Sequence, residues 1–427
     1  MDTIRPPAVW AGVEPSFLTV GGRRRDQLVE TGHADRLSDL DRLADLGVSA
    51  VRYPILWGRN GPETDWEWAA ARLDRLDELG IEPIVGLLHH GWGPDRVDPL
   101  DPHYPALFAA YAVEVARRFP GIRTFLPINE PLTTARFAGL YGWWDPGAMD
   151  LAVFARLIVG QCLAIRAAAR ALRRTDPSIR IIANEDAGKT FGTPELAALV
   201  DLYNDRRWLT FDLLTGRVDR AHPMWESLAA VPGISDRLRV LVDDPEPPDV
   251  LGIDHYITSD RFLDHRRELY PADIVPDPER GFVDVELARV AGFEVDGFWR
   301  GLRDTWDRYG LPLALTEVHL GGDASEEVLW WAEAWHDATS AIRSGIPVEG
   351  VTTWSAFGSC GWDSLLRLDC GTYMPGCYDV SSGEPVLTPL GKAVMATGSG
   401  LPPAPLATGW WRQPYRLAFP RDPNVAA

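Results

Sequence analysis

The chain has 427 residues, of which 46% are hydrophobic and 24% are charged, and its formal net charge is −19 at pH 7. The hydrophobic share is sufficient for a large core and excludes a disordered chain, and the acidic balance argues against a nucleic-acid-binding protein or an anionic-membrane-binding surface. The sequence opens without a basic segment followed by an apolar one, and no uninterrupted apolar run approaches about 18 residues, so we expect a cytoplasmic protein with no signal peptide and no membrane span.

Short apolar runs alternate with segments in which apolar residues recur at helical spacing. The runs predict strands at 9–13, 48–57, 81–88, 122–128, 179–183, 250–256, 311–317 and 351–357. Helices are predicted between them, at about 37–47, 69–79, 108–119, 154–172, 194–208, 296–309 and 328–338. Eight strands alternating with helices predict an α/β fold, a (β/α)8 TIM barrel formed by residues 1–427 as a single domain. We expect the irregular, charged segment at about 260–295 to be a loop insertion near the site, and about 400–427 to be a C-terminal strap.

Two of the predicted strands end in a glutamate. The fourth runs into Asn129-Glu130-Pro131, where the proline cannot continue a central ladder, and the seventh ends at Glu317. The carboxyl ends of barrel strands form the active-site face, so the pattern predicts two carboxylates that converge on one cleft, as in glycoside hydrolysis. Two alternatives stay open: Glu130 caps the next helix, or Glu185, which follows Asn184 at the end of the fifth strand, takes its place.

The order and spacing of several short motifs are similar to those of glycoside hydrolase family 1. They lie between residues 9 and 365: Val51-Arg52-Tyr53-Pro54 through Trp57, His89, Pro127 to Pro131, Asp254-His255-Tyr256, Thr316-Glu317-Val318-His319 and Trp354-Ser355. Several of them depart from the family pattern, and of the family's Tyr-His-Trp after the third strand only His89 is kept. Pro127 stands where the family has Thr, Asp254 stands where it has Asn, and the Asn-Gly that follows the nucleophile is missing. The resemblance implies a TIM barrel and a retaining β-glycosidase without metal or cofactor.

The chemistry assigns a role to each of the two glutamates. Glu317 should be ionised and attack the anomeric carbon, while Glu130 should protonate the leaving oxygen and then activate water. Arg52 should keep Glu317 ionised, and Tyr256 should donate a hydrogen bond to the same carboxylate. A structural ion pair for Arg52 and a core position for Tyr256 are the alternatives.

Further residues are candidates for binding the sugar. Asn129 can hold the 2-hydroxyl and His89 another hydroxyl, although a histidine satisfied by the backbone is the alternative. Trp354, Trp92 and Trp143 can stack on sugar faces or serve only in packing. The family's glutamine on the first strand is absent, and Glu14 stands in that region as a binding candidate or a loop cap. Gly361 stands where the family has a sugar-binding glutamate, and Asp363 is a second candidate. We therefore expect a sugar other than plain glucose.

The expected partner is a small-molecule or oligosaccharide glycoside, and the oligomeric state is left open. A non-hydrolytic sugar-binding or tailoring protein and a transglycosidase are alternatives on the same barrel. The chain looks still closer to a branch in which a similar glycosidase-like domain is joined to a dTDP-4-dehydrorhamnose-reductase-like domain, and it ends before such a domain. Lysine occurs only at Lys189 and Lys392, which indicates a GC-rich bacterial gene. The four cysteines lack zinc-site spacing and predict reduced thiols, with a disulfide among the last three as the alternative.

Overall fold

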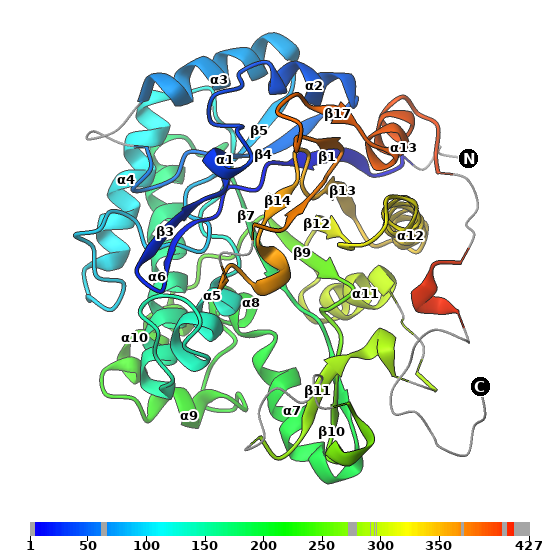
Figure 1. The fold of residues 1–427 in the computed structure, drawn as a ribbon. Coiled ribbons are helices and arrows are strands. Elements are labelled where there is room, and N and C mark those ends of the chain that lie inside the picture. The colour runs from blue at the N-terminus through cyan, green and yellow to red at the C-terminus, as the bar shows by residue number, and fades with distance from the viewer. Residues whose placement is uncertain are drawn as a thin grey trace.

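The computed structural model describes residues 5–60, 66–271, 280–290, 292–293, 295, 297–368, 371–403 and 408–413. Eight parallel strands close into a barrel surrounded by helices, which confirms the predicted TIM barrel (Figure 1). In chain order these strands are β1 (Ala8–Gly12), β4 (Ala50–Pro54), β5 (Glu82–Gly86), β6 (Thr124–Leu126), β7 (Arg180–Asp186), β9 (Val250–Tyr256), β12 (Leu313–His319) and β13 (Val348–Thr353). The barrel closes where β1 pairs with both β4 and β13.

Helices lie outside the strands. The longer ones are α2 (Asp39–Asp45), α3 (Trp66–Leu79), α4 (Tyr104–Arg118), α6 (Leu151–Thr175), α7 (Ala197–Arg206), α10 (Ile234–Asp243), α11 (Gly297–Tyr309), α12 (Ala324–Arg343) and α13 (Pro389–Gly398). Shorter ones are α1 (Gln27–Glu30), α5 (Pro131–Ala135), a π-helix (Arg136–Leu140), α8 (Leu209–Leu214) and α9 (Trp225–Ala229). Single 3-10 turns occur at Pro194–Leu196, Arg267–Leu269, Leu287–Arg289, Trp362–Ser364 and Trp410–Arg412.

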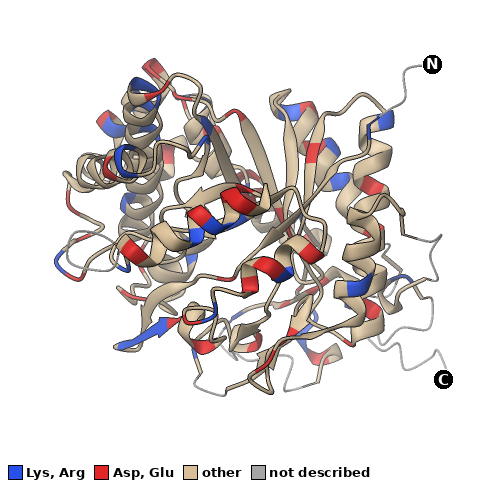
Figure 2. Cartoon of the chain, turned by 90° about the horizontal axis from the view of Figure 1, so that it is seen from above, with Lys and Arg blue, Asp and Glu red and all other residues tan. Residues whose placement is uncertain are grey.

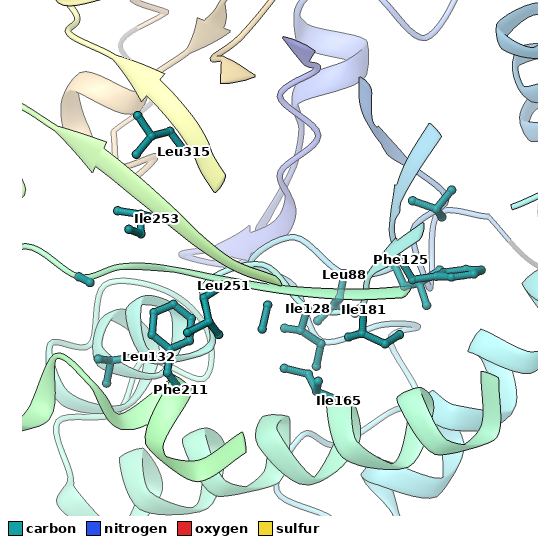
Figure 3. Close-up of a cluster of buried hydrophobic side chains, with 14 of the residues drawn as sticks. Leu88, Phe125, Ile128, Leu132, Ile165, Ile181, Phe211, Leu251, Ile253 and Leu315 are labelled. Atoms are coloured by element: carbon teal, nitrogen blue, oxygen red, sulfur yellow. The ribbon is translucent and has the colours of Figure 1, made fainter. Parts of the chain in front are cut away.

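Two apolar layers hold the barrel together. Inside it, most strands contribute one side chain to a compact cluster made of Trp10, Ala50, Ile84, Leu126, Ile182, Val250 and Ala314. Because successive side chains of a strand point to opposite faces, the neighbouring residues pack outward against the helices. Figure 3 shows this outer layer, in which Ile181 and Leu251 on the strands approach Ile165 on α6 and Phe211 on α8.

Polar side chains follow the inner apolar cluster toward the carboxyl ends of the strands. Arg52, Asn184 and Thr316 each stand two residues beyond a member of that cluster, and all three are buried. The barrel interior is therefore apolar at its centre and polar toward the carboxyl ends of the strands, the face that carries the active site in TIM-barrel enzymes.

The loops differ from the sequence-based expectation in two places. The eighth strand spans 348–353 and not 351–357, because Trp354 already belongs to the loop that follows. The segment from 260 carries regular structure: β10 (Arg261–Asp264) lies between β8 (Thr190–Gly192) and β11 (Val283–Glu286) in a three-stranded sheet. Residues 272–279, 291 and 294 of the expected insertion lie outside the described residues, and its status as an insertion stays a prediction.

Short hairpins complete the described loops. They are β2 (Phe17–Val20) with β3 (Arg23–Asp26), β14 (Ser359–Cys360) with β15 (Tyr373–Met374), and β16 (Tyr378–Asp379) with β17 (Val386–Leu387). Near the C-terminus, the buried Trp411 donates a hydrogen bond to Glu333 on α12. Residues 404–407 and 414–427 of the expected strap lie outside the described residues, so the strap as a whole stays a prediction.

Helix α6 is long and apolar enough to span a membrane by length and composition alone. In the fold, 61% of its most apolar window is buried, and it packs against α4. Its hydrophobicity is thus accounted for by packing within the fold.

Figure 2 shows acidic and basic residues distributed over the outer helices. Cys162, Cys360 and Cys377 are free thiols, and Cys370 lies outside the described residues.

Candidate active site

Glu130 stands at the junction between the end of β6 and the start of α5. The chain beyond β6 stays aligned with its neighbour, because the amide N–H of Asn129 donates to the carbonyl of Leu88 over 2.9 Å. Glu130 then adopts a left-handed backbone conformation, with φ of 42°, which is costly for a residue with a side chain and is typical of functional sites. Its side chain makes no capping hydrogen bond to α5. The capping alternative for Glu130 is therefore wrong.

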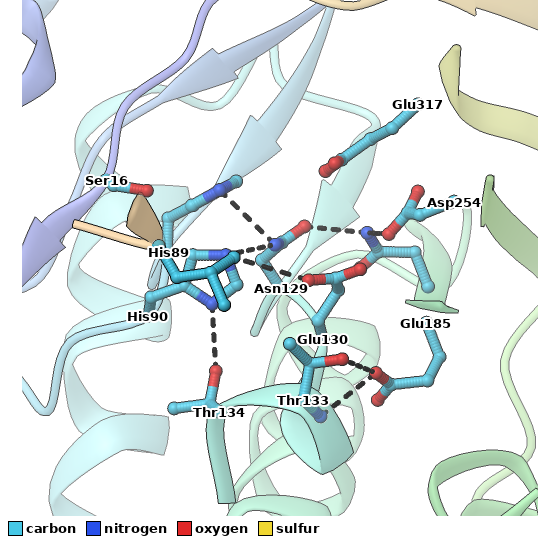
Figure 4. Close-up of polar contacts among 12 residues, drawn as sticks. Ser16, His89, His90, Asn129, Glu130, Thr133, Thr134, Glu185, Asp254 and Glu317 are labelled. Atoms are coloured by element: carbon cyan, nitrogen blue, oxygen red, sulfur yellow. Dashed lines mark hydrogen bonds and ion pairs between the residues drawn. The ribbon is translucent and has the colours of Figure 1, made fainter. Parts of the chain in front are cut away.

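The rival glutamate, Glu185, performs the helix-binding role instead. Its carboxylate accepts hydrogen bonds from the amide N–H groups of Leu132 and Thr133 and from the hydroxyls of Thr133 and Thr210. A carboxylate at a helix N-terminus is stabilised by the unpaired amides there. Glu185 thus fixes the first turn of α5, the turn that Glu130 immediately precedes (Figure 4).

Glu317 enters the barrel because strand β12 changes register. Pairing with β9 shifts between Leu315 and Glu317, so that Glu317 lies opposite Asp254. Such an irregularity lets the adjacent residues Thr316 and Glu317 both contact interior groups. Arg52 donates to the carboxylate of Glu317 over 2.8 Å and to the carbonyl of Thr316 over 2.7 Å. The Tyr256 hydroxyl donates to the other carboxylate oxygen of Glu317.

The structure brings the two predicted catalytic glutamates together at one gap. One carboxylate oxygen from each of Glu130, Asp254 and Glu317 lies within 4.8 Å of the others. All three side chains are buried, and Figure 4 shows them converging from different strands. These three oxygens are close enough to share one cation, but Arg52 already supplies positive charge, 2.8 Å from Glu317 and 3.9 Å from Asp254.

The sequence analysis did not predict Asp254 as a site residue. It accepts hydrogen bonds from the Thr316 hydroxyl over 2.6 Å and from the Asn184 amide. The available signal was its position at the exit of the sixth strand, where the family pattern has an uncharged Asn. Strand-end position alone did not indicate that a third carboxylate would face the two glutamates, because that proximity depends on the register shift in β12.

Asn129 connects Arg52 and Asn184 to the two histidines. Its side-chain oxygen accepts from Arg52 and from Asn184, both over 2.6 Å. Its amide nitrogen lies 3.3 Å from the Nε2 atoms of both His89 and His90. Burial and the Arg52 charge lower the pKa of His90 to about 3, and burial, His90 and Arg52 lower the pKa of His89 as well. Both imidazoles are therefore neutral at pH 7.

Glu14 and Trp354 form one side of the site with His89. The indole N–H of Trp354 donates to Glu14 over 3.1 Å, and the amide N–H of Ser16 donates to the other oxygen over 2.9 Å. His89 stacks on Trp354 at a ring separation of 5.7 Å and lies 3.7 Å from Glu14. A cavity inside the barrel is lined in part by Arg52, His89 and Trp354. Glu14 both holds its loop, as the amide contact requires, and faces the predicted sugar-binding groups.

The other tryptophans and the eighth-strand loop lie farther out. Trp92 donates to the carbonyl of Asp145, and Trp143 is half-buried against Phe137 at a ring separation of 4.9 Å. Gly361 has φ of 77°, and a Cβ at this position would lie 3.0 Å from the Arg25 guanidinium. Asp363, two residues on, is exposed. Neither of these last two is brought into contact with Glu130 or Glu317 in the described residues.

The two glutamates have different surroundings, and this difference separates their pKa values. Burial raises the pKa of Glu317, while the Arg52 charge and the Tyr256 and Arg52 hydrogen bonds oppose the rise. The pKa of Glu130 is raised well above its usual range by burial, then by the charges of Asp254 and Glu317. In the free site Glu317 is therefore the group that ionises first, and Glu130 retains its proton.

Comparison with known proteins gives a distant match. No family model matches the chain. β-Glucosidase A of Thermotoga maritima is 22% identical over 366 residues, covering 76% of this chain and 77% of that protein. β-Glucosidase 34 of Oryza sativa subsp. japonica is 28% identical over 160 residues, covering 34% of this chain and 30% of that protein.

Solved structures share the fold over nearly the whole chain. A family 1 β-glucosidase from Thermotoga maritima superposes with a TM-score of 0.72 at 19% identity, covering 94% of this chain and 98% of that one. The AHE enzyme from Alicyclobacillus herbarius gives a TM-score of 0.70 at 21% identity, covering 87% and 88%. The Thermotoga β-glucosidase has also been solved in complex with deoxynojirimycin and with cyclophellitol. The chain is therefore a distant relative of family 1 β-glucosidases and shares their TIM-barrel fold.

Proposed function

We propose that this protein is a retaining β-glycosidase that hydrolyses a β-linked glycoside by double displacement. The observation that carries the proposal is the pairing of Glu130 and Glu317, whose nearest carboxylate oxygens lie within 4.8 Å. Retaining enzymes hold their two carboxyl groups about 5–5.5 Å apart, whereas inverting enzymes leave about 6.5–9.5 Å for a water molecule. The spacing here supports the retaining mechanism.

The first step forms a covalent intermediate. The ionised Glu317 attacks the anomeric carbon, and Glu130 gives its proton to the oxygen of the departing alcohol as the glycosidic bond breaks. Arg52 and Tyr256 hold the attacking carboxylate by direct hydrogen bonds. Asn129, fixed by Arg52 and Asn184, is positioned to bind the 2-hydroxyl, a contact that strengthens in the transition state.

The second step releases the sugar. Glu130, now ionised, takes a proton from water, the resulting hydroxide attacks the anomeric carbon, and the ester to Glu317 breaks with retention of configuration. Loss of the negative charge on Glu317 in the intermediate removes one source of repulsion, so the pKa of Glu130 falls when it must act as a base. The same residues serve a transglycosidase if an alcohol replaces water.

The glycone is proposed to differ from plain glucose. Glu14 stands where a glutamine was expected and Gly361 where a glutamate was expected, so two groups that bind outer hydroxyls are changed. Glu14 accepts from Ser16 and Trp354, which leaves it part of its acceptor capacity for a sugar hydroxyl. The finer resemblance to glycosidase-like domains joined to reductase-like domains, and a cytoplasmic location, stay predictions.

The test of the role of Glu130 uses two leaving groups. Glu130→Gln removes the proton donor with little change of shape, so aryl glycosides with a poorly acidic phenol should slow by about 10²–10⁴-fold. Glycosides of an acidic phenol need no proton and should form the intermediate at a nearly normal rate. Equal slowing of both classes, with an unchanged circular dichroism spectrum, contradicts the assignment. Absence of hydrolysis by the wild type favours the non-hydrolytic alternative.

A further inference from the structure

Asp254 faces the reacting gap as directly as the two glutamates do. It is fully buried near the end of β9, opposite Glu317 in the strand register, and one of its oxygens lies within 4.8 Å of both Glu130 and Glu317. A two-carboxylate mechanism does not require this third group. In a site with Arg52 as the cation that contacts the cluster, three adjacent carboxylates are not all ionised, because like charges at such separations repel.

The hydrogen bonds decide where charge and proton reside. Asp254 accepts from the Thr316 hydroxyl and the Asn184 amide, and its Oδ1 atom lies 3.9 Å from Arg52. Within the described part of the chain, the carboxyl group of Glu130 accepts no hydrogen bond, and the nearest basic nitrogen, on the neutral His90, lies 3.7 Å away. Hydrogen bonds to an ionised carboxylate favour that form. Asp254 is thus equipped for a negative charge, and Glu130 is equipped for a proton.

The other charged groups near the cluster are Glu317, Glu185, Asp186 and Arg136, and the partly buried Arg136 interacts electrostatically with Glu130, Glu185 and Asp186. Glu317 is held by Arg52 and Tyr256, and Glu185 accepts four hydrogen bonds from the first turn of α5 and the Thr210 hydroxyl. Asp186 contributes more weakly to Glu130 than Asp254, Glu317 and Glu185 do. Burial and the charge of Glu317 raise the pKa of Asp254 well above its usual range, while Arg52 and the Thr316 hydrogen bond oppose that rise. The assignment of the charge to Asp254 therefore rests on its hydrogen bonds, which the carboxyl group of Glu130 lacks.

We propose that Asp254 is a positioning residue for the reaction, a third carboxylate whose charge, anchored by Thr316, Asn184 and Arg52, holds the proton on Glu130. This proposal rests on the proposed glycosidase function. It has a consequence for the second step. Esterification removes the charge of Glu317 but leaves that of Asp254, so the pKa of Glu130 stays higher in the intermediate. Glu130 then regains a proton from solvent more readily, and water attack, which requires ionised Glu130, is slowed. Asp254 therefore favours the first step at the expense of the second.

The test is Asp254→Asn, which keeps the shape and removes the charge. The alkaline limb of the kcat/KM profile, which reports the protonated Glu130, should move to lower pH by about one unit or more. At pH 7 the isolated 2-deoxy-2-fluoro glycosyl-enzyme should turn over several-fold faster than the wild-type intermediate. The unpartnered Oδ1 of Asn184 can accept a hydrogen bond from the new amide after that side chain rotates, which favours folding of the variant.

Two further variants make the test specific. Thr316→Val removes one donor to Asp254 and should move the alkaline limb in the same direction by a smaller amount. Asp186→Asn removes a more weakly coupled carboxylate and should move it less than Asp254→Asn does. An alkaline limb that stays in place or moves to higher pH in Asp254→Asn overturns the proposal.

A direct titration makes the result independent of turnover. In protein labelled with ¹³C at glutamate carboxyls, the signal lost in Glu130→Gln identifies Glu130, and its midpoint should fall in Asp254→Asn. An unchanged midpoint overturns the role of Asp254 whatever the activity. Failure of the proposed function is seen separately, as full activity in Glu317→Gln. A glycosidase that needs Glu317 but has an unchanged Glu130 midpoint in Asp254→Asn loses only the inference about Asp254.

Discussion

At the scale of single residues, one arginine balances the charge of the Glu317 carboxylate. Arg52 is buried and bonds Glu317, Asn129 and the carbonyl of Thr316 at once. Its guanidinium also lies over the Trp354 ring, with 4.3 Å between the guanidinium carbon and the ring centroid. A planar, permanently charged group with several donors suits this position better than an ammonium does.

The hydrogen bond from Tyr256 gives a pH-dependent prediction. Its hydroxyl opposes the rise that burial causes in the pKa of Glu317, so Tyr256→Phe should raise that pKa further. Because Glu317 must be ionised to attack, activity is lost as pH falls through its pKa. The acid limb of kcat/KM should therefore move to higher pH in the variant, as measured with an aryl glycoside between pH 4 and 8.

Arg52 variants provide the matched control for that shift. Arg52→Met removes the charge and should move the acid limb in the same direction by more than Tyr256→Phe does. Arg52→Lys keeps the charge and should move it less than Arg52→Met. An acid limb that moves to lower pH in Tyr256→Phe would show that the hydroxyl does not stabilise the ionised nucleophile.

Glu14 gives a prediction about the choice of sugar. Burial, opposed in part by Ser16, raises its pKa to about 7, so its charge changes near neutral pH. An ionised Glu14 accepts a sugar hydroxyl better than a protonated one, and KM should fall as pH rises through about 7 in the wild type. In Glu14→Gln this dependence should disappear. Equal pH dependence of KM in both proteins counts against contact between Glu14 and the sugar.

A panel of aryl glycosides examines the same part of the site. The β-glucoside should not exceed the β-galactoside, the β-fucoside and deoxy-sugar glycosides by tenfold in kcat/KM, because two expected hydroxyl-binding groups are changed. A glucoside preference above tenfold would show that other residues replace them.

Sequence rules located the glutamates but not the network around them. Strand exits followed by Glu predicted Glu130 and Glu317 because strand ends meet at one face of a barrel. The hydrogen bonds that Asn184 and Thr316 make to Asp254 depend on which strands are neighbours and on the β12 register shift. Neither of these can be predicted from the sequence alone. The role of Glu185 likewise required the position of α5 in space.

At the scale of elements, three strands meet closely beneath the catalytic groups. Gly252 on β9 lies between β7 and β12, and a Cβ there would lie 2.5 Å from the Thr316 hydroxyl and 2.8 Å from the Asn184 Cβ. These are the residues that bond Asp254. Glycine at this position therefore permits the close approach on which the carboxylate cluster depends.

Because of this close packing, Gly252→Ala should disturb the site more than a Gly→Ala substitution at a less crowded position. We expect a loss of about 1–3 kcal/mol in the free energy of unfolding, measured with urea, because the added methyl overpacks a filled interior. The kcat of the folded variant should fall at least tenfold as Thr316 and Asn184 move. Gly301→Ala is the matched control, since a Cβ there meets only the Ile253 side chain at 3.6 Å. Equal effects of the two variants would contradict the argument.

Element boundaries show what periodicity resolves and what it misses. The barrel strands and most of the longer helices were predicted within a few residues, but the helices α10 (Ile234–Asp243) and α13 (Pro389–Gly398) were missed. The eighth strand was placed too late, because the apolar residues Trp354, Ala356 and Phe357 continue beyond its end into a buried loop. The short helices α8 and α9 and the strands β10 and β11 are too brief to establish a period, and they are stabilised by tertiary contacts.

At the scale of the whole molecule, one architecture serves both stability and chemistry. The apolar cluster within the barrel holds the strands in register. The polar residues beyond it hold close together carboxylates that mutual repulsion would drive apart in a looser fold. Glu130, Asp254 and Glu317, which lie near the ends of strands β6, β9 and β12, all have raised pKa values, as do the nearby Glu14 and Glu185. Such clustering is characteristic of catalytic sites.

In the proposed reaction Glu317 forms a covalent bond with the sugar. The most direct measurement is the intact and peptide mass after incubation with a panel of activated 2-deoxy-2-fluoro glycosides, with Glu317→Gln treated in parallel as the control. We predict a single adduct of one fluorosugar on the peptide that contains Glu317, and none on the variant. An adduct on Glu130 or Glu185, or wild-type protein left unlabelled by every member of the panel, would contradict the account.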